Sequence, residues 1–144
     1  AWGLGVDKSE QAVIVASANA DATKLCERSS FFVGDWTNAI DGLFDLVIAN
    51  PPYIPSQDIE NLQPEVLHEP LAALDGGTDG LEIINELMVQ ASNKMSRPGT
   101  ILIEFYPEQS TALKTLADQL LSPCESYIIN DLYGDDRLLV LKLL

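Results

Sequence analysis

The stretch Phe44-Asp45-Leu46-Val47-Ile48-Ala49-Asn50-Pro51-Pro52-Tyr53-Ile54-Pro55 decides how this chain folds. Its first half is apolar and contains the β-branched residues Val47 and Ile48, a pattern typical of a buried β-strand. Pro51 has no N–H group to donate to a sheet, and it disfavours helical backbone at Asn50. We therefore expect a strand that ends at Asn50 and passes into a stiff, extended turn. In open α/β sheets, ligands bind beyond the carboxyl ends of the parallel strands.

The turn itself offers groups for chemistry. The amide oxygen of Asn50 and the carbonyl oxygen of Pro51 can each accept a hydrogen bond, and Tyr53 supplies an aromatic face. Two acceptors beside a flat ring suit a planar –NH2 group, which is a poor nucleophile because its lone pair is delocalised. Holding both hydrogens while the nitrogen pyramidalises favours attack on an electrophile placed in line. A ring near a sulfonium methyl adds a cation–π attraction of about 0.5–2 kcal/mol.

These residues resemble a known family motif. Asn50-Pro51-Pro52-Tyr53 after an apolar strand is similar to the motif of amino-methyltransferases that use S-adenosylmethionine and act on adenine, on guanine in RNA or on glutamine. The extension Ile54-Pro55 and the run from Glu69 to Leu81 narrow the resemblance to the HemK-type glutamine N5-methyltransferases, which modify peptide chain release factors. The segment from Asp131 to Arg137 resembles the terminal Asp-Leu-x-Gly-x-x-Arg signature of that family. The resemblance extends from about Trp2 to Leu143.

The resemblance implies a fold and a reaction. The expected fold is α/β and Rossmann-like, of the S-adenosylmethionine-dependent methyltransferase type, with a mostly parallel sheet whose last strand is antiparallel. Residues 1–144 are expected to form one catalytic domain. The implied reaction transfers a methyl group from S-adenosylmethionine to the side-chain amide nitrogen of a glutamine in a release factor. The residues expected to carry it are Asn50, Pro51, Pro52 and Tyr53.

An acidic residue at position 7 is the first candidate for cofactor binding. Residues 2–7 are predicted to form a short strand that ends in Asp7, before a helix for which Ser9 is a plausible N-cap. A carboxylate in that position can accept hydrogen bonds from both hydroxyls of a ribose. The alternative is an Asp that only belongs to the cap region of the helix.

Further cofactor candidates follow the next predicted strand, residues 31–33. The resemblance implies that Asp35 meets the adenine amino group and that Trp36 lies next to the adenine ring. The alternative is a turn aspartate and a core tryptophan. The resemblance also assigns Asn50 to the cofactor side of the site, so the expected cofactor set is Asp7, Asp35, Trp36 and Asn50.

The remaining sequence predicts a long loop followed by alternating helices and strands. The loop covers residues 54–78, with short helical pieces near 58–61 and 64–68, and its length indicates a lid or a substrate rim. The predicted elements after it are a helix at about 79–94, a break at 96–99, a strand at 100–105, a helix at 110–121 and strands at 126–130 and 138–143.

Composition limits the choice of substrate and compartment. The formal net charge is −14, with 8 Lys and Arg against 22 Asp and Glu, so direct binding to nucleic acid is not expected. An acidic surface suits a basic protein partner or simply confers solubility. Cys26 and Cys124 are predicted to be reduced thiols of a cytoplasmic protein. His68 has no metal-ligand companions at useful spacing, so no metal site is expected, and no membrane span is expected either.

The resemblance begins late in the family's pattern. The family has a central strand and a Gly-rich loop before the position of Asp7, and a helical domain before those. Their absence predicts a carboxyl-terminal part of a catalytic domain, with a gap between the strands at 2–6 and 46–50. A strand-swapped dimer, or a shift of the first strand, would close the gap. Alternative functions are methylation of an exocyclic base amine, and an inactive fragment that acts as a binding module.

Overall fold

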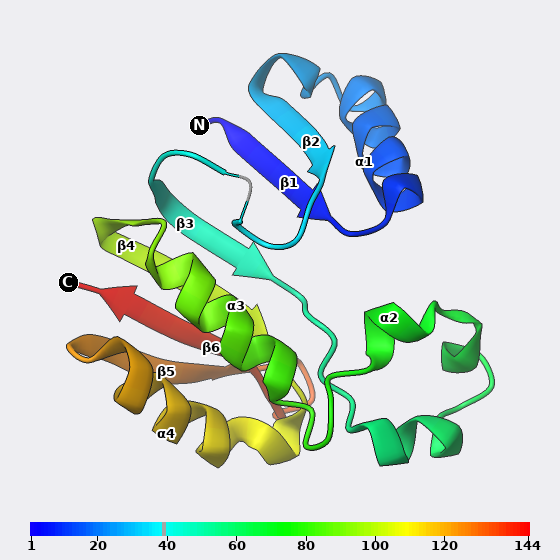
Figure 1. Cartoon of the computed structure of the whole chain (residues 1–144), viewed down its shortest axis with the longest axis vertical. Helices are drawn as coiled ribbons and strands as arrows, with labels where there is room; N and C mark the ends of the chain where they lie inside the picture. The colour runs from blue at the N-terminus through cyan, green and yellow to red at the C-terminus, as the bar shows by residue number, and fades with distance from the viewer. Residues whose placement is uncertain (39) are drawn as a thin grey trace. The chain divides into compact units, whose positions relative to one another are not determined.

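The computed structural model describes residues 1–38 and 40–144, in two compact units, Ala1–Asp41 and Gly42–Leu144 (Figure 1). Each unit is described by itself. In the first unit, strand β1 (Gly3–Asp7) pairs in parallel with β2 (Ser29–Val33). Helix α1 (Glu10–Ala22) and a 3-10 turn, η1 (Cys26–Arg28), connect them. The hydroxyl of Ser9 accepts a hydrogen bond from the Ala12 N–H at 3.2 Å, which confirms the predicted N-cap.

The second unit is a four-stranded mixed sheet in the order β3-β4-β6-β5. Its strands are β3 (Phe44–Ala49), β4 (Met95–Glu104), β5 (Cys124–Asn130) and β6 (Asp136–Leu143). Strands β3 and β4 are parallel, and β6 runs antiparallel to both of its neighbours. The expected antiparallel last strand is therefore confirmed, but this sheet is mixed and not mostly parallel, because β6 pairs antiparallel with both β4 and β5.

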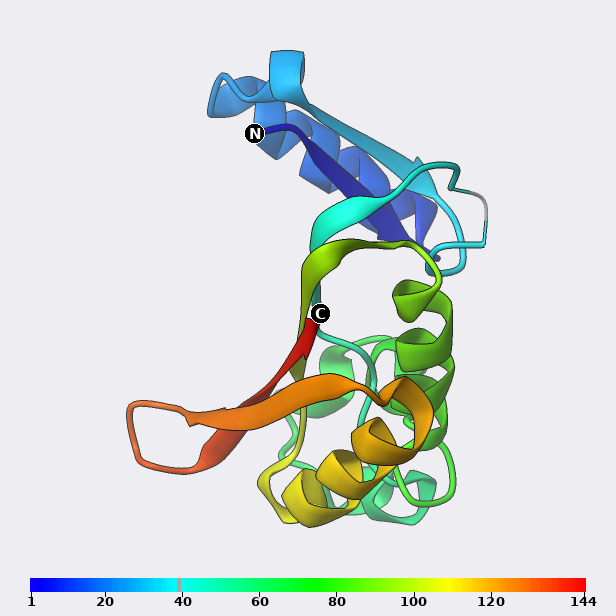
Figure 2. The same cartoon turned by 90° about the vertical axis from the view of Figure 1, so that its left-hand side faces the viewer.

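Two helices cover one face of this sheet, as Figure 2 shows: α3 (Glu82–Ser92) and α4 (Ser110–Leu121). Their apolar faces pack on the central strands because leucine, isoleucine and methionine recur at helical spacing. The largest fully buried core side chains of the unit are Ile84, Leu87, Met88, Ile101, Ile103, Phe105, Leu113, Leu139, Leu141 and Leu143. The two core methionines thus need no role beyond packing.

The prediction that residues 44–50 form a buried, central strand is wrong in its burial. Within the described residues β3 is hydrogen-bonded to β4 on one side only, and the side chains of Leu46 and Ile48 are 49% and 69% exposed. The apolar composition that suggested burial on both faces therefore belongs to an edge strand of this sheet.

The expected break at residues 96–99 is instead part of β4. The pairing of β3 with β4 jumps from Phe44–Met95 to Leu46–Thr100, so residues 96–98 form an irregularity in the ladder. Pro98 fits there because a proline is tolerated where the ladder is interrupted. The hydroxyl of Ser96 donates a hydrogen bond to the Phe44 carbonyl at 3.1 Å, which ties the irregular segment to β3.

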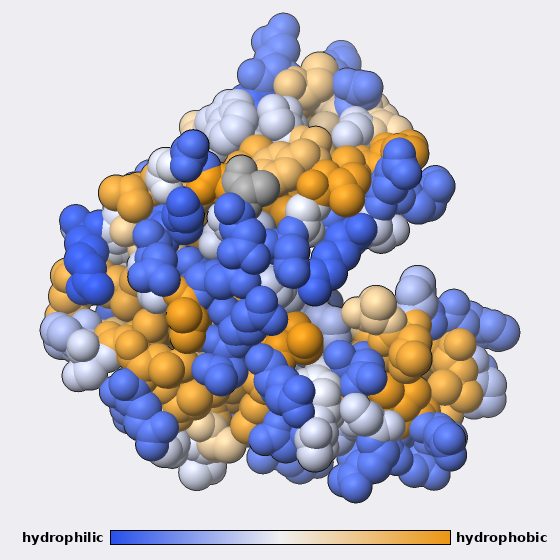
Figure 3. Space-filling model, viewed as in Figure 1, coloured by the Kyte–Doolittle hydropathy of each residue, from blue (hydrophilic) through white to orange (hydrophobic). Residues whose placement is uncertain are grey.

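The long loop after β3 contains η2 (Ser56–Asn61) and η3 (Val66–His68), close to the predicted helical pieces, and a short helix α2 (Leu71–Leu74) that was not predicted. A parallel bridge between Ile54 and Asp75 closes the loop at its base. Apolar surface gathers over this segment in the space-filling view (Figure 3). Exposed leucines contribute to it, with Leu67 at 47% and Leu71 at 60%.

Helix α3 begins at Glu82, later than the predicted residue 79. Gly80 has a φ of +75°, which a right-handed helix does not allow, so the helix starts after it. Both cysteines are free thiols in the structure. Across residues 1–38 and 40–144, none of the helices has the length and apolar character needed to cross a membrane.

Candidate active site

The two predicted hydrogen-bond acceptors in the turn after β3 differ in their exposure to solvent. Asn50 is exposed at the end of the strand, whereas Pro51 is fully buried and fixes the turn against the unit. Neither the Asn50 side chain nor the Pro51 carbonyl forms a hydrogen bond within the described part of the chain. The amide oxygen of the exposed Asn50 is thus available to accept a hydrogen from a ligand, whereas the Pro51 carbonyl is an unpaired acceptor on a buried residue.

Tyr53 is anchored by its hydroxyl. The hydroxyl donates a hydrogen bond to Oε1 of Glu104 at 3.4 Å, and Glu104 is the last residue of the neighbouring parallel strand β4. Burial raises the pKa of the Tyr53 hydroxyl above its usual value of 10.0, the charge of Glu104 raises it further, and Arg137 acts in the opposite direction. The phenol therefore stays protonated at neutral pH and can hold its ring in place through this bond.

The terminal signature around Asp131 holds Arg137 at the start of β6. Asp131 accepts hydrogen bonds from the backbone N–H groups of Tyr133 at 2.9 Å and Asp135 at 3.1 Å. Its other oxygen pairs with the guanidinium of Arg137 at 3.4 Å. The bond from Tyr133 is the main reason why the pKa of Asp131 lies below its usual value. Arg137 lowers the pKa of the Tyr53 hydroxyl, so the segment from Asp131 to Arg137 lies near the turn that contains Tyr53.

In the first unit, Asp7 and Asp35 lie at the same edge of the β1–β2 pair. Asp7 is the last residue of β1, and its carbonyl accepts a hydrogen bond from the Gly34 N–H at 3.0 Å. Oδ1 of Asp7 accepts a hydrogen bond from the Ser9 N–H at 2.7 Å, as the cap alternative expects. Oδ1 of Asp35 pairs with the Lys8 ammonium at 3.0 Å. The carboxyl ends of parallel strands are the usual place for a nucleotide ligand.

Trp36 directly follows Asp35 in the sequence and has an unusual backbone conformation. Its φ is +50°, which is uncommon for a residue other than glycine, and its buried indole Nε1 has no hydrogen-bond partner within the described residues. A buried donor without a partner costs about 1–3 kcal/mol, so it requires an explanation. A bound ligand that accepts this hydrogen would provide one.

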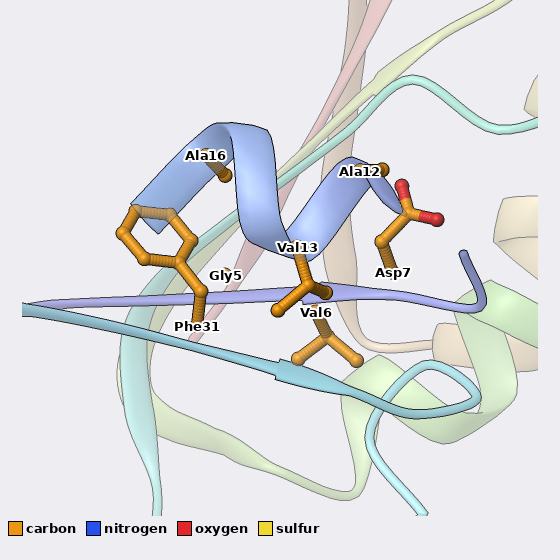
Figure 4. Close-up of a pocket in the computed structure, with 7 residues that line it drawn as sticks. All are labelled: Gly5, Val6, Asp7, Ala12, Val13, Ala16 and Phe31. Carbon is orange, nitrogen blue, oxygen red and sulfur yellow. The ribbon is translucent and has the colours of Figure 1, made fainter. Parts of the chain in front are cut away.

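A small pocket lies between α1 and the two strands of the first unit (Figure 4). Its walls are apolar except for Asp7, and it exists because Ala12 and Ala16 are small and face Gly5 and Phe31. A ribose needs polar partners on several sides, so this gap under the helix does not suit it. The pocket is a packing gap, and apart from Asp7 the polar groups that suit a nucleotide lie outside it, at the ends of β1 and β2.

Comparisons with known proteins show which proteins this chain is similar to in sequence. No protein-family model matches the chain. The chain is 42% identical over 143 residues to "Release factor glutamine methyltransferase" of Rhodospirillum rubrum. The aligned region covers 99% of this chain and 44% of that protein. The chain is 39% identical over 142 residues to the protein of the same description from Caulobacter vibrioides, covering 97% of this chain and 49% of that protein.

The chain is homologous to the release factor glutamine methyltransferases. The resemblance inferred from the Asn50–Tyr53 motif is confirmed by these similarities, which run over nearly the whole chain. The chain spans about half the length of the curated relatives it matches.

Solved structures agree at the level of the fold. The catalytic domain of hMettl16, solved with an RNA hairpin, has a TM-score of 0.74 at 11% identity, covering 99% of this chain and 56% of that chain. SMU.1697c of Streptococcus mutans, solved in complex with SAH, has a TM-score of 0.63 at 13% identity, covering 98% of this chain and 75% of that chain. The chain thus has an α/β fold that matches methyltransferase structures.

Relative to the release factor glutamine methyltransferase motif, the structure adds one set of residues that sequence reasoning did not assign to the site. Gly76, Gly80 and Gln109 pack directly against the backbone of Tyr53. Their contact with Tyr53 spans up to 56 positions in sequence, so no local periodicity signals it.

Proposed function

We propose that the protein containing this chain transfers a methyl group from S-adenosylmethionine to the side-chain amide nitrogen of a glutamine in a peptide chain release factor. The observation that carries the proposal is the turn after β3. It holds two acceptors that have no hydrogen-bond partner among the described residues, Oδ1 of the exposed Asn50 and the carbonyl of the buried Pro51, beside an anchored Tyr53 ring. The similarity to proteins described as release factor glutamine methyltransferases supports this choice of substrate.

Each residue of the turn has a defined role in this proposal. Asn50 and Pro51 accept one hydrogen each from the glutamine amide, which orients its nitrogen and releases the lone pair as that nitrogen pyramidalises. Pro52 keeps the turn extended because its ring fixes φ. Tyr53 lays its ring against the amide plane, and the bond from its hydroxyl to Glu104 limits rotation of that ring.

S-Adenosylmethionine, when bound, supplies an electrophilic methyl group. We propose that the carboxylate of Asp7 accepts hydrogen bonds from the ribose hydroxyls, that Asp35 accepts one from the adenine amino group and that Trp36 lies beside the adenine. The unpartnered Nε1 of Trp36 and the position of both acids at the carboxyl ends of β1 and β2 support this assignment. Asn50 is proposed to contact the cofactor as well as the amide.

The proposal includes a protein partner and a compartment. A net charge of −14 favours a protein substrate over a nucleic acid, because phosphates are bound through Lys and Arg. We place the reaction in the cytoplasm, where thiols such as Cys26 and Cys124 stay reduced. A strand-swapped dimer stays a prediction, and analytical ultracentrifugation would test it.

A methyl-transfer assay tests the proposed function. The complete protein in which this sequence occurs is incubated with S-adenosylmethionine and either a release-factor peptide that presents a glutamine or an adenine-containing oligonucleotide. We expect one methyl group on the glutamine side chain, located by fragmentation in a mass spectrometer. A peptide with asparagine in place of that glutamine is the control. Preferential methylation of the oligonucleotide, or neither cofactor binding nor turnover, would overturn the proposal.

A further inference from the structure

Both the nitrogen and the oxygen of the Gln109 side-chain amide form hydrogen bonds to backbone groups of the second unit. Its Nε2 donates hydrogen bonds to the Tyr53 carbonyl at 2.9 Å and to the Asp79 carbonyl at 3.3 Å, and its Oε1 accepts one from the Tyr106 N–H at 3.1 Å. The side chain is 7% exposed. A buried amide that satisfies every one of these groups is costly to replace, since each lost bond leaves a buried backbone group unpaired.

These hydrogen bonds join three segments that are distant in sequence. Tyr53 belongs to the turn after β3, Asp79 to the glycine-containing turn before α3, and Tyr106 to the chain just after β4. The first two segments run side by side in Figure 1, where β3 leaves the sheet and α3 begins. Gln109 thus connects the loops at the carboxyl ends of β3 and β4, in addition to the bond between the Tyr53 hydroxyl and Glu104.

The space around the Tyr53 backbone is already full. A Cβ on Gly80 would collide with the Tyr53 carbonyl and with Nε2 of Gln109, and a Cβ on Gly76 would lie 2.8 Å from the Tyr53 Cα. The next residue, Ile54, is held on both sides, because its N–H donates to the Leu74 carbonyl at 3.0 Å and its carbonyl accepts from the Gly76 N–H at 2.9 Å. Among the described residues, the side chain that donates a hydrogen bond to the Tyr53 carbonyl in this crowded place is Gln109.

We propose that Gln109 is a positioning residue that sets the orientation of the turn from Asn50 to Tyr53 for methyl transfer. This inference rests on the proposed function. Fixing the Tyr53 carbonyl fixes the peptide plane that follows Tyr53. The rings of Pro51 and Pro52 fix φ at both residues, so the chain before Tyr53 has fewer torsions that can absorb a rotation of the turn.

Small errors of position are expensive in such a site. A displacement of about 1 Å in a positioning group can reduce a rate by about 100-fold, because the acceptors then miss the hydrogens of the reacting amide. Gln109 itself acts through Tyr53 and does not need to touch the substrate. Its loss should therefore reduce kcat far more than it changes the KM for S-adenosylmethionine.

A matched pair of substitutions separates hydrogen bonding from packing. Gln109→Glu keeps the shape of the side chain but replaces the –NH2 donor by an oxygen. An ionised carboxylate facing the Tyr53 and Asp79 carbonyls is repelled, whereas a protonated carboxyl group has one O–H that can donate to Tyr53 while its other oxygen still accepts from Tyr106. Gln109→Met has a similar length and no donor at any pH. Gln119→Glu makes the same charge change at an exposed position of α4 and is the control.

The experiment measures kcat on the glutamine peptide between about pH 6 and pH 8, at a temperature where circular dichroism shows every variant folded. Burial raises the pKa of the introduced carboxyl group, so its protonated fraction increases toward pH 6. At about pH 8 we expect both Gln109 variants to lose at least ~30-fold in kcat, which corresponds to a lost positioning bond of about 2 kcal/mol. Relative to the wild type, Gln109→Glu should recover several-fold toward pH 6, and Gln109→Met should not recover.

Hydrogen exchange provides a readout that does not depend on turnover. Peptides that cover residues 50–56 should exchange faster in both Gln109 variants at about pH 8 than in the wild type or in Gln119→Glu. Wild-type kcat in Gln109→Glu at that pH, or unchanged exchange in the turn, would overturn the positioning role. A wild-type protein that does not methylate the peptide would overturn the proposed function instead, and the exchange data would still decide whether Gln109 holds the turn.

Discussion

The hydroxyl of Tyr53 donates a hydrogen bond to Glu104 Oε1 at 3.4 Å, which joins the turn after β3 to the last residue of β4. These two residues lie 51 positions apart in sequence and meet because β3 and β4 are parallel neighbours whose carboxyl ends share one edge. The bond gives the aromatic ring of the turn a fixed orientation. It also separates two contributions of Tyr53, its ring and its hydroxyl, that can be tested one at a time.

The ring should matter more than the hydroxyl. Tyr53→Phe removes the bond to Glu104, and a neutral or charge-assisted hydrogen bond of this kind contributes about 0.5–3 kcal/mol, with the long distance favouring the lower end. We expect kcat on the glutamine peptide to fall by about 10-fold or less in Tyr53→Phe and clearly more in Tyr53→Ala. Equal losses in the two variants would mean that the hydroxyl has a chemical role and would contradict this division.

The Glu104 carboxylate should also be visible in the titration of Tyr53. Burial is the largest cause of the raised pKa of Tyr53, and the negative charge of Glu104 adds to it. Glu104→Gln removes that charge, so the pKa of Tyr53 should decrease relative to the wild type while staying under the influence of burial. Phenolate absorbance across the alkaline range measures this, with Tyr53→Phe subtracted as the reference. A pKa that rises in Glu104→Gln would contradict the assigned contact.

Low pH should weaken the hydrogen bonds that Asp75 accepts within the loop after β3. Asp75 accepts hydrogen bonds from the Ser56 hydroxyl at 2.6 Å and from the Gly77 N–H at 3.0 Å, and the bond from Ser56 is the main reason why its pKa lies below 3.8. Because the folded-state pKa is lowered, this stabilisation is fully present above the unfolded value and is lost as the pH falls through the folded value.

Asp75→Asn is the variant that reports on this bond. Its free energy of unfolding should be lower than that of the wild type at neutral pH, and the difference should shrink once the pH falls below about 3.8. Denaturant titrations at several pH values measure the difference. A gap that stays constant down to the lowest pH would show that the Asp75 carboxylate contributes nothing as an anion.

Gly80 should tolerate a side chain far less than Gly134 does. Both have positive φ values, +75° and +93°, so an alanine at either site costs about 1–2 kcal/mol in backbone strain. At Gly80 the added Cβ also meets the Tyr53 carbonyl and the Gln109 amide, whereas at Gly134 it meets nothing within 4 Å. Gly80→Ala should therefore lower both the melting temperature and kcat much more than Gly134→Ala. Similar effects of the two substitutions would contradict the close packing around Tyr53.

The secondary structure could largely be predicted from the sequence because its signals are local. The Ser9 cap, the helix at 110–121 and the extended turn after residue 49 each follow from residue types within one or two turns of chain. The burial of β3 could not be predicted in this way, because exposure of Leu46 and Ile48 depends on which strands lie beside β3. An apolar strand has the same composition at the centre of a sheet and at its edge.

In the candidate site, too, some residues could be predicted from local sequence and others could not. The extended turn from Asn50 to Tyr53 could be predicted because a proline pair after an apolar strand has few structural alternatives, and the resemblance of these residues to a family motif assigned the site to this turn. Glu104, Gln109 and Gly80 could not be assigned to the site from spacing, since they meet Tyr53 only after the sheet and the loops have formed.

The claim that Asn50 holds the reacting amide is tested most directly by Asn50→Ala in the complete protein. The measurement pairs kcat on the glutamine peptide with the dissociation constant of S-adenosylmethionine from calorimetry. Loss of a hydrogen bond that forms in the transition state costs about 2–4 kcal/mol, so we predict that kcat falls at least ~30-fold. The dissociation constant should change little, because the proposed cofactor contacts at Asp7 and Asp35 remain. Turnover that survives while cofactor binding collapses would contradict the account.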